Sequence, residues 1–423
     1  MPGIDEARMK RNSIRKQFGL IFAVLIIGFF VICTIDVALN NTSSTQMDLF
    51  FLRMDDFLAD YSNTAGYSYR GSPYQNSTHG YQHHQYPPLA YLLSQFASCF
   101  SGNMRKHYNA QYFLKLYQEP LFIYSFILLY MFIAICGFEL IKKNVKRSRD
   151  KWLISIAMMV SYPVLFTIER GNNAIIASIL VMVYCFFYDH DSKAVRELAL
   201  IALALAVALK LTPAVLAILL IYDKRYKDAV RITIYGALFT VLPFCFLDGG
   251  LAKELPLWYR NVRISAVRHS AFSGISISAV MANFLGGADA VDEIPALRTT
   301  LLIVNYVICA FFLLSAPLYR QKWEKILAVT MVSISISGQS LEYNLLYLIP
   351  FMVFFFNEEE YRVADGITLL FILLIMYTYQ SDLWTWGLNY NIAILGLCVM
   401  LLAKGIHNIC LWHPINRLRG VGA

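Results

Sequence analysis

Long apolar runs constrain this sequence more than any other feature. Stretches of roughly 15 to 22 residues recur with few charges, first from Phe18 to about Leu39 and again from Pro120 to Ile141. A helix needs about 20 apolar residues to cross about 30 Å of hydrocarbon, and backbone groups in lipid must pair within their own segment. Because the runs lack period-2 alternation, they predict helices and not barrel strands. With 58% hydrophobic and 15% charged residues, a soluble domain is excluded.

Basic residues between the runs predict the orientation. The net charge of +8 lies mostly in short loops, and cytoplasmic loops are the ones enriched in Lys and Arg. The basic stretch 8–16 therefore places the N-terminus in the cytoplasm, and the basic stretch 142–149 returns the second span to it. We further expect spans at Trp152 to Ile168, Ala174 to Tyr188, Ile232 to Leu247, Thr300 to Tyr319, Ile326 to Ser337, Leu345 to Phe356, Gly366 to Tyr379 and Ile392 to Ala403.

The resulting domain plan is one all-α polytopic bundle with about 12 crossings and both termini inside. It consists of a cytoplasmic basic N-terminus (1–17), a transmembrane domain (18–404) and a cytoplasmic tail (405–423). External loops are predicted at about 40–119 and 248–298. Within the first of them, Pro88 to Phe100 is too short to span and is typical of an interfacial or re-entrant helix.

One apolar block, Leu198 to Tyr222, has Lys and Arg on both flanks. A single span would violate the charge rule, whereas two short helices meeting at Lys210-Leu211-Thr212-Pro213 would obey it. We therefore favour a hairpin whose tip points outside.

Polar residues gather on the predicted external face. Just beyond the first span the chain carries Asp48, Asp55, Asp56 and Asp60, and later loops add cations and aromatic residues. Ions at the membrane edge are costly and tend to be functional. Carboxylates, cations and aromatics over a lipid-lined bundle suit an amphiphilic substrate with an anionic head and an apolar tail. The residues on this face are Asp48, Asp55, Asp56, Glu169, Arg170, Lys210, Trp258, Arg260, Arg263, Arg268, His269, Glu342, Asn344 and Asp382.

A succession of short motifs resembles glycosyltransferase family 87. The motifs are Asp48-Leu49, Gly71-x-Pro73-Tyr74, Tyr86-Pro87-Pro88-Leu89, Glu169-Arg170-Gly171-Asn172-Asn173 and Ala208-Leu209-Lys210-Leu211-Thr212-Pro213, within about residues 45 to 225. The resemblance implies a GT-C type membrane bundle whose external loops bear the active site, as in polyprenol-phosphate-mannose-dependent mannosyltransferases. It also implies that Asp48, the first acid of the first external loop, is the base. Where the family often has a Ser-Trp-x-His-type segment, this chain reads Ser340-Leu341-Glu342-Tyr343-Asn344.

The implied reaction moves a hexose, with mannose favoured, from a polyprenyl-phosphate donor to a lipid or glycan acceptor outside a bacterial plasma membrane. A hydroxyl displaces the phosphate with inversion, so a general base must accept a proton and cations must stabilise the departing phosphate. Asp48 is the expected base. Candidate donor-phosphate ligands are Lys210, Arg170, Arg263, Arg260, Arg268 and His269. Candidate acceptor or sugar contacts are Asp55, Asp56, Tyr86, Asn172, Trp258, Glu342 and Asn344.

Other interpretations of these residues remain open. Asp48 could cap a helix, Lys210 could snorkel to the headgroups, and Arg170 could pair with Glu169. A polytopic transporter or flippase of lipid-linked sugars, or a non-catalytic scaffold, would also be a helical bundle, although no internal repeat is visible. We expect no metal or other cofactor, because the histidines lack a partner carboxylate pattern. Those histidines are His79, His83, His84 and His107.

Overall fold

The fold is described by a computed structural model. It describes residues 2–40, 58–68, 72–75, 85–99, 119–146, 150–268, 274–337, 340–360, 362–377 and 389–412. These ranges contain helices and no strand, and a single bridge joins Gly274 and Ser340. The predicted all-α class is therefore confirmed.

The helices of the first half are α1 (Pro2–Asn40), α3 (Ala59–Ser68), α4 (Pro88–Ser98), α6 (Pro120–Asn144), α7 (Lys151–Met159), α8 (Tyr162–Arg170), α9 (Ala174–Phe187) and α10 (Lys193–Leu209). They are followed by η2 (Thr212–Ala217), α11 (Ile218–Tyr222), α12 (Tyr226–Val241), η3 (Leu242–Phe246), α13 (Gly250–Arg268), α14 (Ile277–Phe284) and α15 (Ala288–Asp292). The last are α16 (Pro295–Ser315), η4 (Ala316–Leu318), α17 (Lys322–Ser335), η5 (Glu342–Leu348), α18 (Ile349–Asn357), α19 (Val363–Met376) and α20 (Asn389–Trp412).

Membrane-spanning length is reached by fewer helices than the sequence predicts. Within the described ranges five segments are long and apolar enough to cross a bilayer, namely Gln17–Ile35, Pro120–Asn144, Tyr226–Phe246, Pro295–Leu318 and Tyr390–Leu411. The bent pair α7 and α8 would make six. Helices such as α9, with 14 residues, extend only about 21 Å at 1.5 Å per residue. The predicted count of about twelve crossings is thus not confirmed, although the multi-pass class is.

The bend between α7 and α8 has a local cause. The two helices meet at 45°, within the single span predicted from Trp152 to Ile168. Pro163 stands in the first turn of α8. It has no N–H to donate into the preceding turn, and in a continuous helix its ring would clash with the carbonyl four residues back. The helix therefore stops at Met159 and restarts at Tyr162.

The predicted hairpin at Lys210 is confirmed by its ends. α10 stops at Leu209, and the chain resumes as η2 and α11. Arg225 follows the second arm of the hairpin and donates to the carbonyl of Tyr188, which precedes the first arm. Arg231, further along, pairs with Glu197 in the first arm. Both ends of the segment therefore lie on one side of the bundle, and Lys210 lies at the opposite tip.

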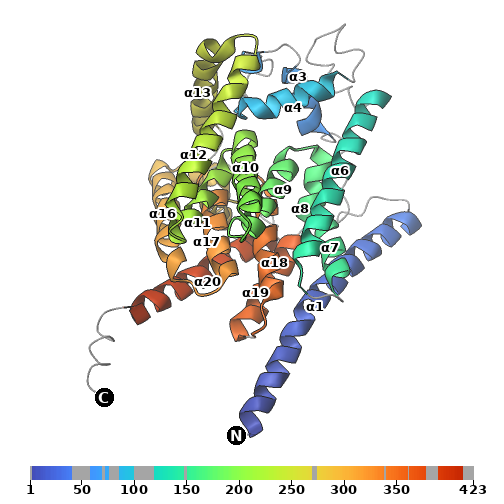
Figure 1. Cartoon of the computed structure of the whole chain (residues 1–423), viewed down its shortest axis with the longest axis vertical. Coiled ribbons are helices and arrows are strands. Elements are labelled where there is room, and N and C mark those ends of the chain that lie inside the picture. Colours follow the sequence, from blue (N-terminus) through green and yellow to red (C-terminus); the bar gives the residue numbers. More distant parts are fainter. Residues whose placement is uncertain are drawn as a thin grey trace.

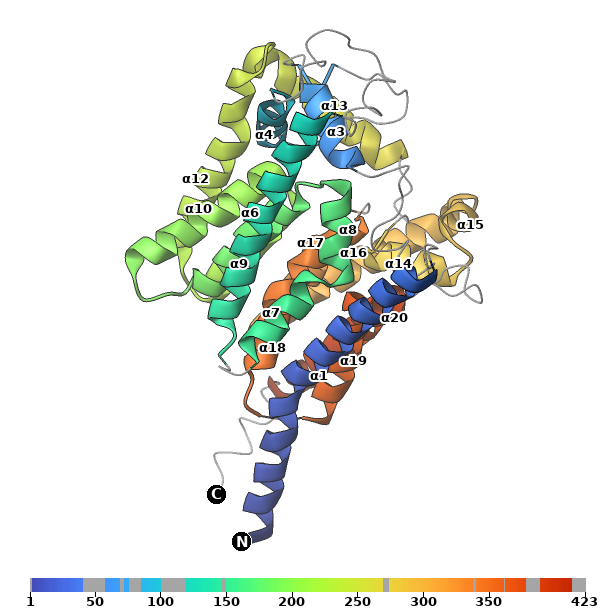
Figure 2. The same ribbon diagram turned by 90° about the vertical axis from the view of Figure 1, so that its right-hand side faces the viewer.

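α17 is the central helix of the bundle. All of its residues from Ile326 to Ser335 are buried, and this stretch carries only apolar and small hydroxyl side chains. Around it the views agree that α3, α4 and α13 lie at one end of the molecule and both termini toward the other (Figures 1 and 2). α4 runs across that first end, in keeping with a helix too short to span (Figure 1).

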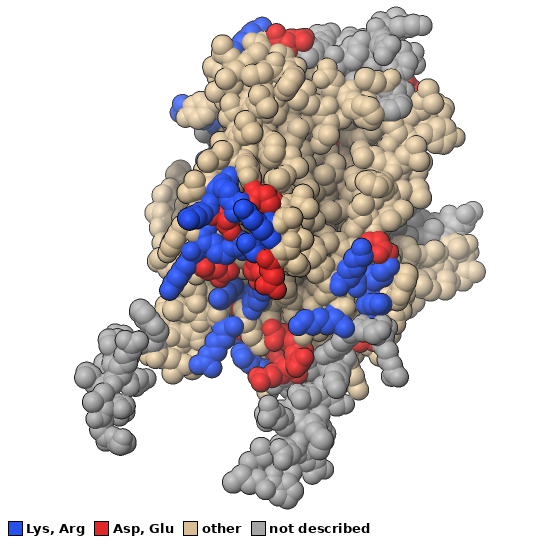
Figure 3. Space-filling view, viewed as in Figure 1, with Lys and Arg blue, Asp and Glu red and all other residues tan. Residues whose placement is uncertain are grey.

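Polar loops are divided between the two ends as the charge pattern predicts. The loops predicted to be cytoplasmic contact one another. Nζ of Lys322 lies 2.6 Å from Oδ2 of Asp189, and Nζ of Lys404 lies 2.8 Å from Oε1 of Glu324. On the face shown in Figure 3, charged side chains gather in a band across the lower half. The opposite end brings together a second, smaller polar group, which forms the site described next.

Candidate active site

Asp60, in the first turn of α3, is the centre of the polar cluster. Its carboxylate accepts hydrogen bonds from Nδ2 of Asn172 at 2.7 Å and from Nε of Arg170 at 3.1 Å. The Arg170 and Asp60 side chains are only 20% and 23% exposed. Because this pair is partly buried, it is screened less than a surface ion pair. Asp60 therefore connects α3 to the turn between α8 and α9.

That turn depends on Gly171. The residue caps α8 in the left-handed region at φ 64°, where glycine carries no Cβ penalty. A Cβ at this position would lie 2.5 Å from Cβ of Tyr61, so α3 packs directly on the turn. Asn172 then accepts a hydrogen bond from the Ala174 N–H at the start of α9. The Arg-Gly-Asn sequence thus directs both flanking side chains toward Asp60.

Lys210 is buried at the tip of the hairpin, with 8% of its surface exposed. Its Nζ lies 3.6 Å from the ring centroid of Tyr343 and 5.6 Å from that of Tyr86. The two rings offer their negative faces to the ammonium. Burial lowers the pKa of Lys210 to about 7, and the negative charge of Asp60 opposes part of that shift.

Two tyrosines complete the cluster. The hydroxyl of Tyr86 accepts from Asn172 at 3.3 Å and shares a hydrogen bond with Tyr343. Burial raises the pKa of Tyr86 to about 12 and that of Tyr343 well above its usual range, so both hydroxyls stay protonated at neutral pH. The site combines one carboxylate, two cations, one amide and two phenols, which suits an anionic, hydroxyl-bearing ligand.

Contacts from α13 and from the segment 72–75 hold Tyr86 in place. Trp258 donates from Nε1 to the carbonyl of Gln85 at 3.0 Å, and Tyr74 donates to the carbonyl of Tyr86 at 2.9 Å. Asn261 in turn donates to the carbonyl of Tyr74 at 3.1 Å. Pro88 then begins α4, where the missing N–H is not needed.

Four of the residues predicted from sequence therefore meet in space: Tyr86, Arg170, Asn172 and Lys210. Sequence reasoning placed Asp60 among the external acids but gave it no role, and it assigned Tyr343 none. Asp60 is recognisable only through its contacts with Arg170 and Asn172, which are 110 and 112 residues away. In the segment Ser340–Asn344, where the resemblance leads one to expect Trp and His, this chain has Tyr343, whose ring lies over the ammonium of Lys210.

Other predicted residues lie elsewhere. Glu342 accepts from Tyr390 at 2.9 Å, and Asn344 donates to Ser340 at 2.9 Å. Arg260 and Arg263 are exposed on α13, where Arg263 lies over the Tyr259 ring, and Trp258 contacts the chain beside Tyr86 instead of the cluster itself. Outside the described residues lie Asp48, Asp55, Asp56, Asp382, His79, His83, His84, His107, His269 and the side chain of Arg268. Roles for all of these residues stay predictions.

In the part of the chain that the structure describes, no three His, Cys, Asp or Glu side chains gather in a way that could hold a metal ion.

Comparison with known proteins points to one family. Searches against curated proteins and against solved structures gave no match. The sequence model of glycosyltransferase family 87 matches residues 84–337, well over half of the 423 residues. The match contains Tyr86, Arg170, Asn172 and Lys210, reaches further toward the C-terminus than the motifs alone indicate, and begins after Asp60. The chain therefore belongs to glycosyltransferase family 87, a family of membrane glycosyltransferases.

Proposed function

We propose that this protein transfers a hexose, with mannose favoured, from a polyprenyl-phosphate-linked donor to a lipid or glycan acceptor. The reaction takes place at the outer face of a bacterial plasma membrane and inverts the anomeric carbon. One observation carries the proposal: a buried lysine and a half-buried arginine converge with sugar-compatible phenol and amide groups at one end of an apolar bundle.

The reaction needs one displacement. The acceptor oxygen forms a bond to the anomeric carbon while the bond from that carbon to the phosphate oxygen breaks, and its electron pair leaves with the phosphate. The departing phosphate thereby gains one negative charge. We assign the stabilisation of that charge to Lys210 and Arg170, because preorganised cations stabilise a developing charge without reorganisation during the reaction.

The general base is proposed to be Asp48, which takes the proton of the acceptor hydroxyl. A carboxylate in hydrogen-bond reach of that hydroxyl typically accelerates the step by about 10² to 10⁴-fold. Asp60 is a poorer candidate, because Arg170 and Asn172 both donate to its Oδ2 and Arg170 also donates to its Oδ1 at 3.5 Å. We assign to Asp60 the role of positioning Arg170 and to Tyr86 and Asn172 that of contacting the sugar.

The test is a transfer assay in nanodiscs with radiolabelled polyprenyl-phosphate-mannose and an extract of host lipids. Asp48→Asn should abolish transfer while donor binding persists, and Asp191→Asn, on an exposed loop at the opposite end, should behave as wild type. Full activity in Asp48→Asn would overturn its role as base. Wild-type protein that moves the donor across the bilayer without transferring sugar would favour a flippase and overturn the proposal.

A further inference from the structure

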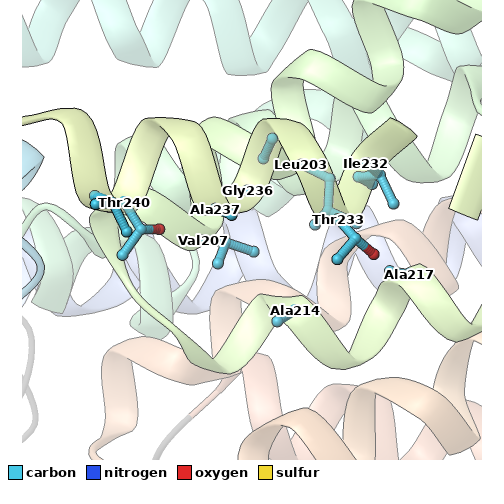
Figure 4. A pocket seen from close by; sticks show the side chains of 11 residues that line it. Leu203, Val207, Ala214, Ala217, Ile232, Thr233, Gly236, Ala237 and Thr240 are labelled. Carbon is cyan, nitrogen blue, oxygen red and sulfur yellow. The ribbon is translucent and has the colours of Figure 1, made fainter. Parts of the chain in front are cut away.

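α13 carries a fully buried acid, in contrast to the helix before it. α12 lines an apolar groove with α10 and η2, and none of the described side chains that line this groove is charged (Figure 4). Beyond η3 the chain enters α13, where Glu254 is 0% exposed. Gly249 leaves the space that the carboxyl fills, because a Cβ at this glycine would collide with Oε1 of Glu254. The mechanism proposed above gives this buried carboxyl no part.

The carboxyl of Glu254 holds both ends of a tight turn. Residues 72–75 form a β-turn in which the N–H of Gln75 donates to the carbonyl of Ser72 at 3.3 Å. Pro73 occupies the second position, where its fixed φ suits such a turn. Oε1 of Glu254 accepts from Oγ of Ser72 and, at 3.4 Å, from Nε2 of Gln75. One carboxyl oxygen thus clamps the first and the last residue of the turn.

The other carboxyl oxygen indicates that this clamp contributes little to overall stability. Oε2 of Glu254 is buried and has no hydrogen-bond partner among the described residues. Leaving a buried polar oxygen unpaired costs free energy, which offsets much of what the bonds from Ser72 and Gln75 contribute. The consequence of an acid at this position is therefore geometric, since it fixes two donors of the turn against α13.

The clamped turn leads directly to the polar cluster. Tyr74, the third residue of the turn, is 1% exposed, and its ring lies edge-on to that of Tyr91 with the centroids 5.4 Å apart. Its hydroxyl donates to the carbonyl of Tyr86 at 2.9 Å. The hydroxyl of Tyr86 in turn accepts from Asn172 at 3.3 Å. A displacement of the turn would therefore be passed on to a phenol of the site.

Two further residues of α13 hold the same stretch of chain. Trp258 and Asn261 follow Glu254 by four and seven positions, so the three side chains lie on one face of the helix. Trp258 donates to the carbonyl of Gln85, and Asn261 donates to the carbonyl of Tyr74. One face of α13 thus fixes both the turn and the residue that precedes Tyr86.

We propose that Glu254 is a positioning residue for sugar transfer. Its carboxyl fixes the turn 72–75, and the turn fixes Tyr86 through Tyr74. A misplacement of about 1 Å can cost on the order of 10²-fold in rate, so the position of a phenol against the sugar matters. The inference rests on the proposed function, in which Tyr86 contacts the sugar, and adds a residue that acts without touching the substrate.

A double-mutant cycle with Tyr86 tests this role during transfer. Glu254→Leu should lower kcat/KM for the donor about tenfold, whereas Glu254→Gln, whose amide oxygen can still accept from Ser72 and Gln75, should stay within about threefold of wild type. In a Tyr86→Phe background Glu254→Leu should cost less than about twofold, because the hydroxyl that it positions is gone. Glu293→Leu, the same substitution at an exposed position, should behave as wild type. Equal losses in both backgrounds would show general damage and overturn the inference.

Fluorine NMR tests the position of Tyr86 without turnover. The probe is 3-fluorotyrosine at position 86 of the full-length protein in nanodiscs. Glu254→Leu and the milder Ser72→Ala should move its signal by more than the wild-type line width, and Glu254→Gln should leave it in place. A signal that stays in place in both Glu254→Leu and Ser72→Ala would overturn the inference and leave the proposed function standing. A signal that moves as expected, while wild-type protein transfers no sugar, would overturn the proposed function and leave the clamp on Tyr86 standing.

Discussion

The pH dependence of donor capture provides the sharpest test of Lys210. Burial lowers its pKa from 10.5 to about 7, so the side chain is mostly charged at pH 6 and mostly neutral at pH 8. The proposed donor is a phosphodiester, which keeps its negative charge throughout this range. The protonated fraction falls from about 0.9 at pH 6 to about 0.1 at pH 8 for a group with pKa near 7. Donor capture should therefore weaken as pH rises.

The expected magnitude is a fall in kcat/KM for the donor of about tenfold between pH 6 and pH 8. kcat/KM is the quantity to measure because it reports groups of the free enzyme, whereas a bound phosphate would raise the pKa of Lys210. In Lys210→Arg the guanidinium stays charged, so the fall in kcat/KM toward alkaline pH, called the alkaline limb below, should disappear. In Lys210→Met, kcat/KM should be low at every pH and should not fall further toward alkaline pH.

Lys253→Met is the matched control, because Lys253 is exposed on α13 and should keep the wild-type profile. The reasoning is refuted if wild-type kcat/KM is flat or rising from pH 6 to pH 8. It is equally refuted if Lys210→Arg retains the limb, because the titrating group would then lie elsewhere.

Three further outcomes follow from the same contacts. Asp60→Asn should lower kcat/KM by about 10 to 100-fold and move the alkaline limb to lower pH, because the carboxylate orients Arg170 and favours the charged form of Lys210. Gly171→Ala should lower the melting temperature by at least about 2 °C, because left-handed strain costs about 1–2 kcal/mol and the added Cβ would clash with α3. Tyr343→Phe keeps the ring over the cation and should cost less than tenfold in kcat/KM, whereas Tyr343→Leu should cost more.

Matched variants separate these effects from general damage. Asp289→Asn lies on an exposed part of α15 and should leave both rate and pH profile unchanged. Gly28→Ala adds a Cβ that meets no atom within 4 Å and should not lower the melting temperature. Equal losses in Gly171→Ala and Gly28→Ala, or a stronger loss in Tyr343→Phe than in Tyr343→Leu, would contradict the roles given to the turn and to the ring.

The helices, the hairpin and several site residues could be predicted from the sequence, because they depend on residues that are close together in the chain. Apolar runs predict helices because lipid offers the backbone no hydrogen-bond partners, and the class is confirmed. The cations flanking 198–222 predict the hairpin at Lys210 because a single span would leave one basic flank outside, and the structure agrees. Arg170, Asn172 and Tyr86 were recognisable because they stand in short motifs.

Tertiary packing decided the remainder. The sequence orders Asp48 before Asp60 and offers no reason to prefer the second, yet α3 packs on Gly171 and brings Asp60 to Arg170 and Asn172. Tyr343 joins the cluster because the chain after α17 returns beside the hairpin tip. Hydropathy and charge act on neighbouring residues and are visible in one dimension, whereas side chains more than 100 residues apart meet only through the fold.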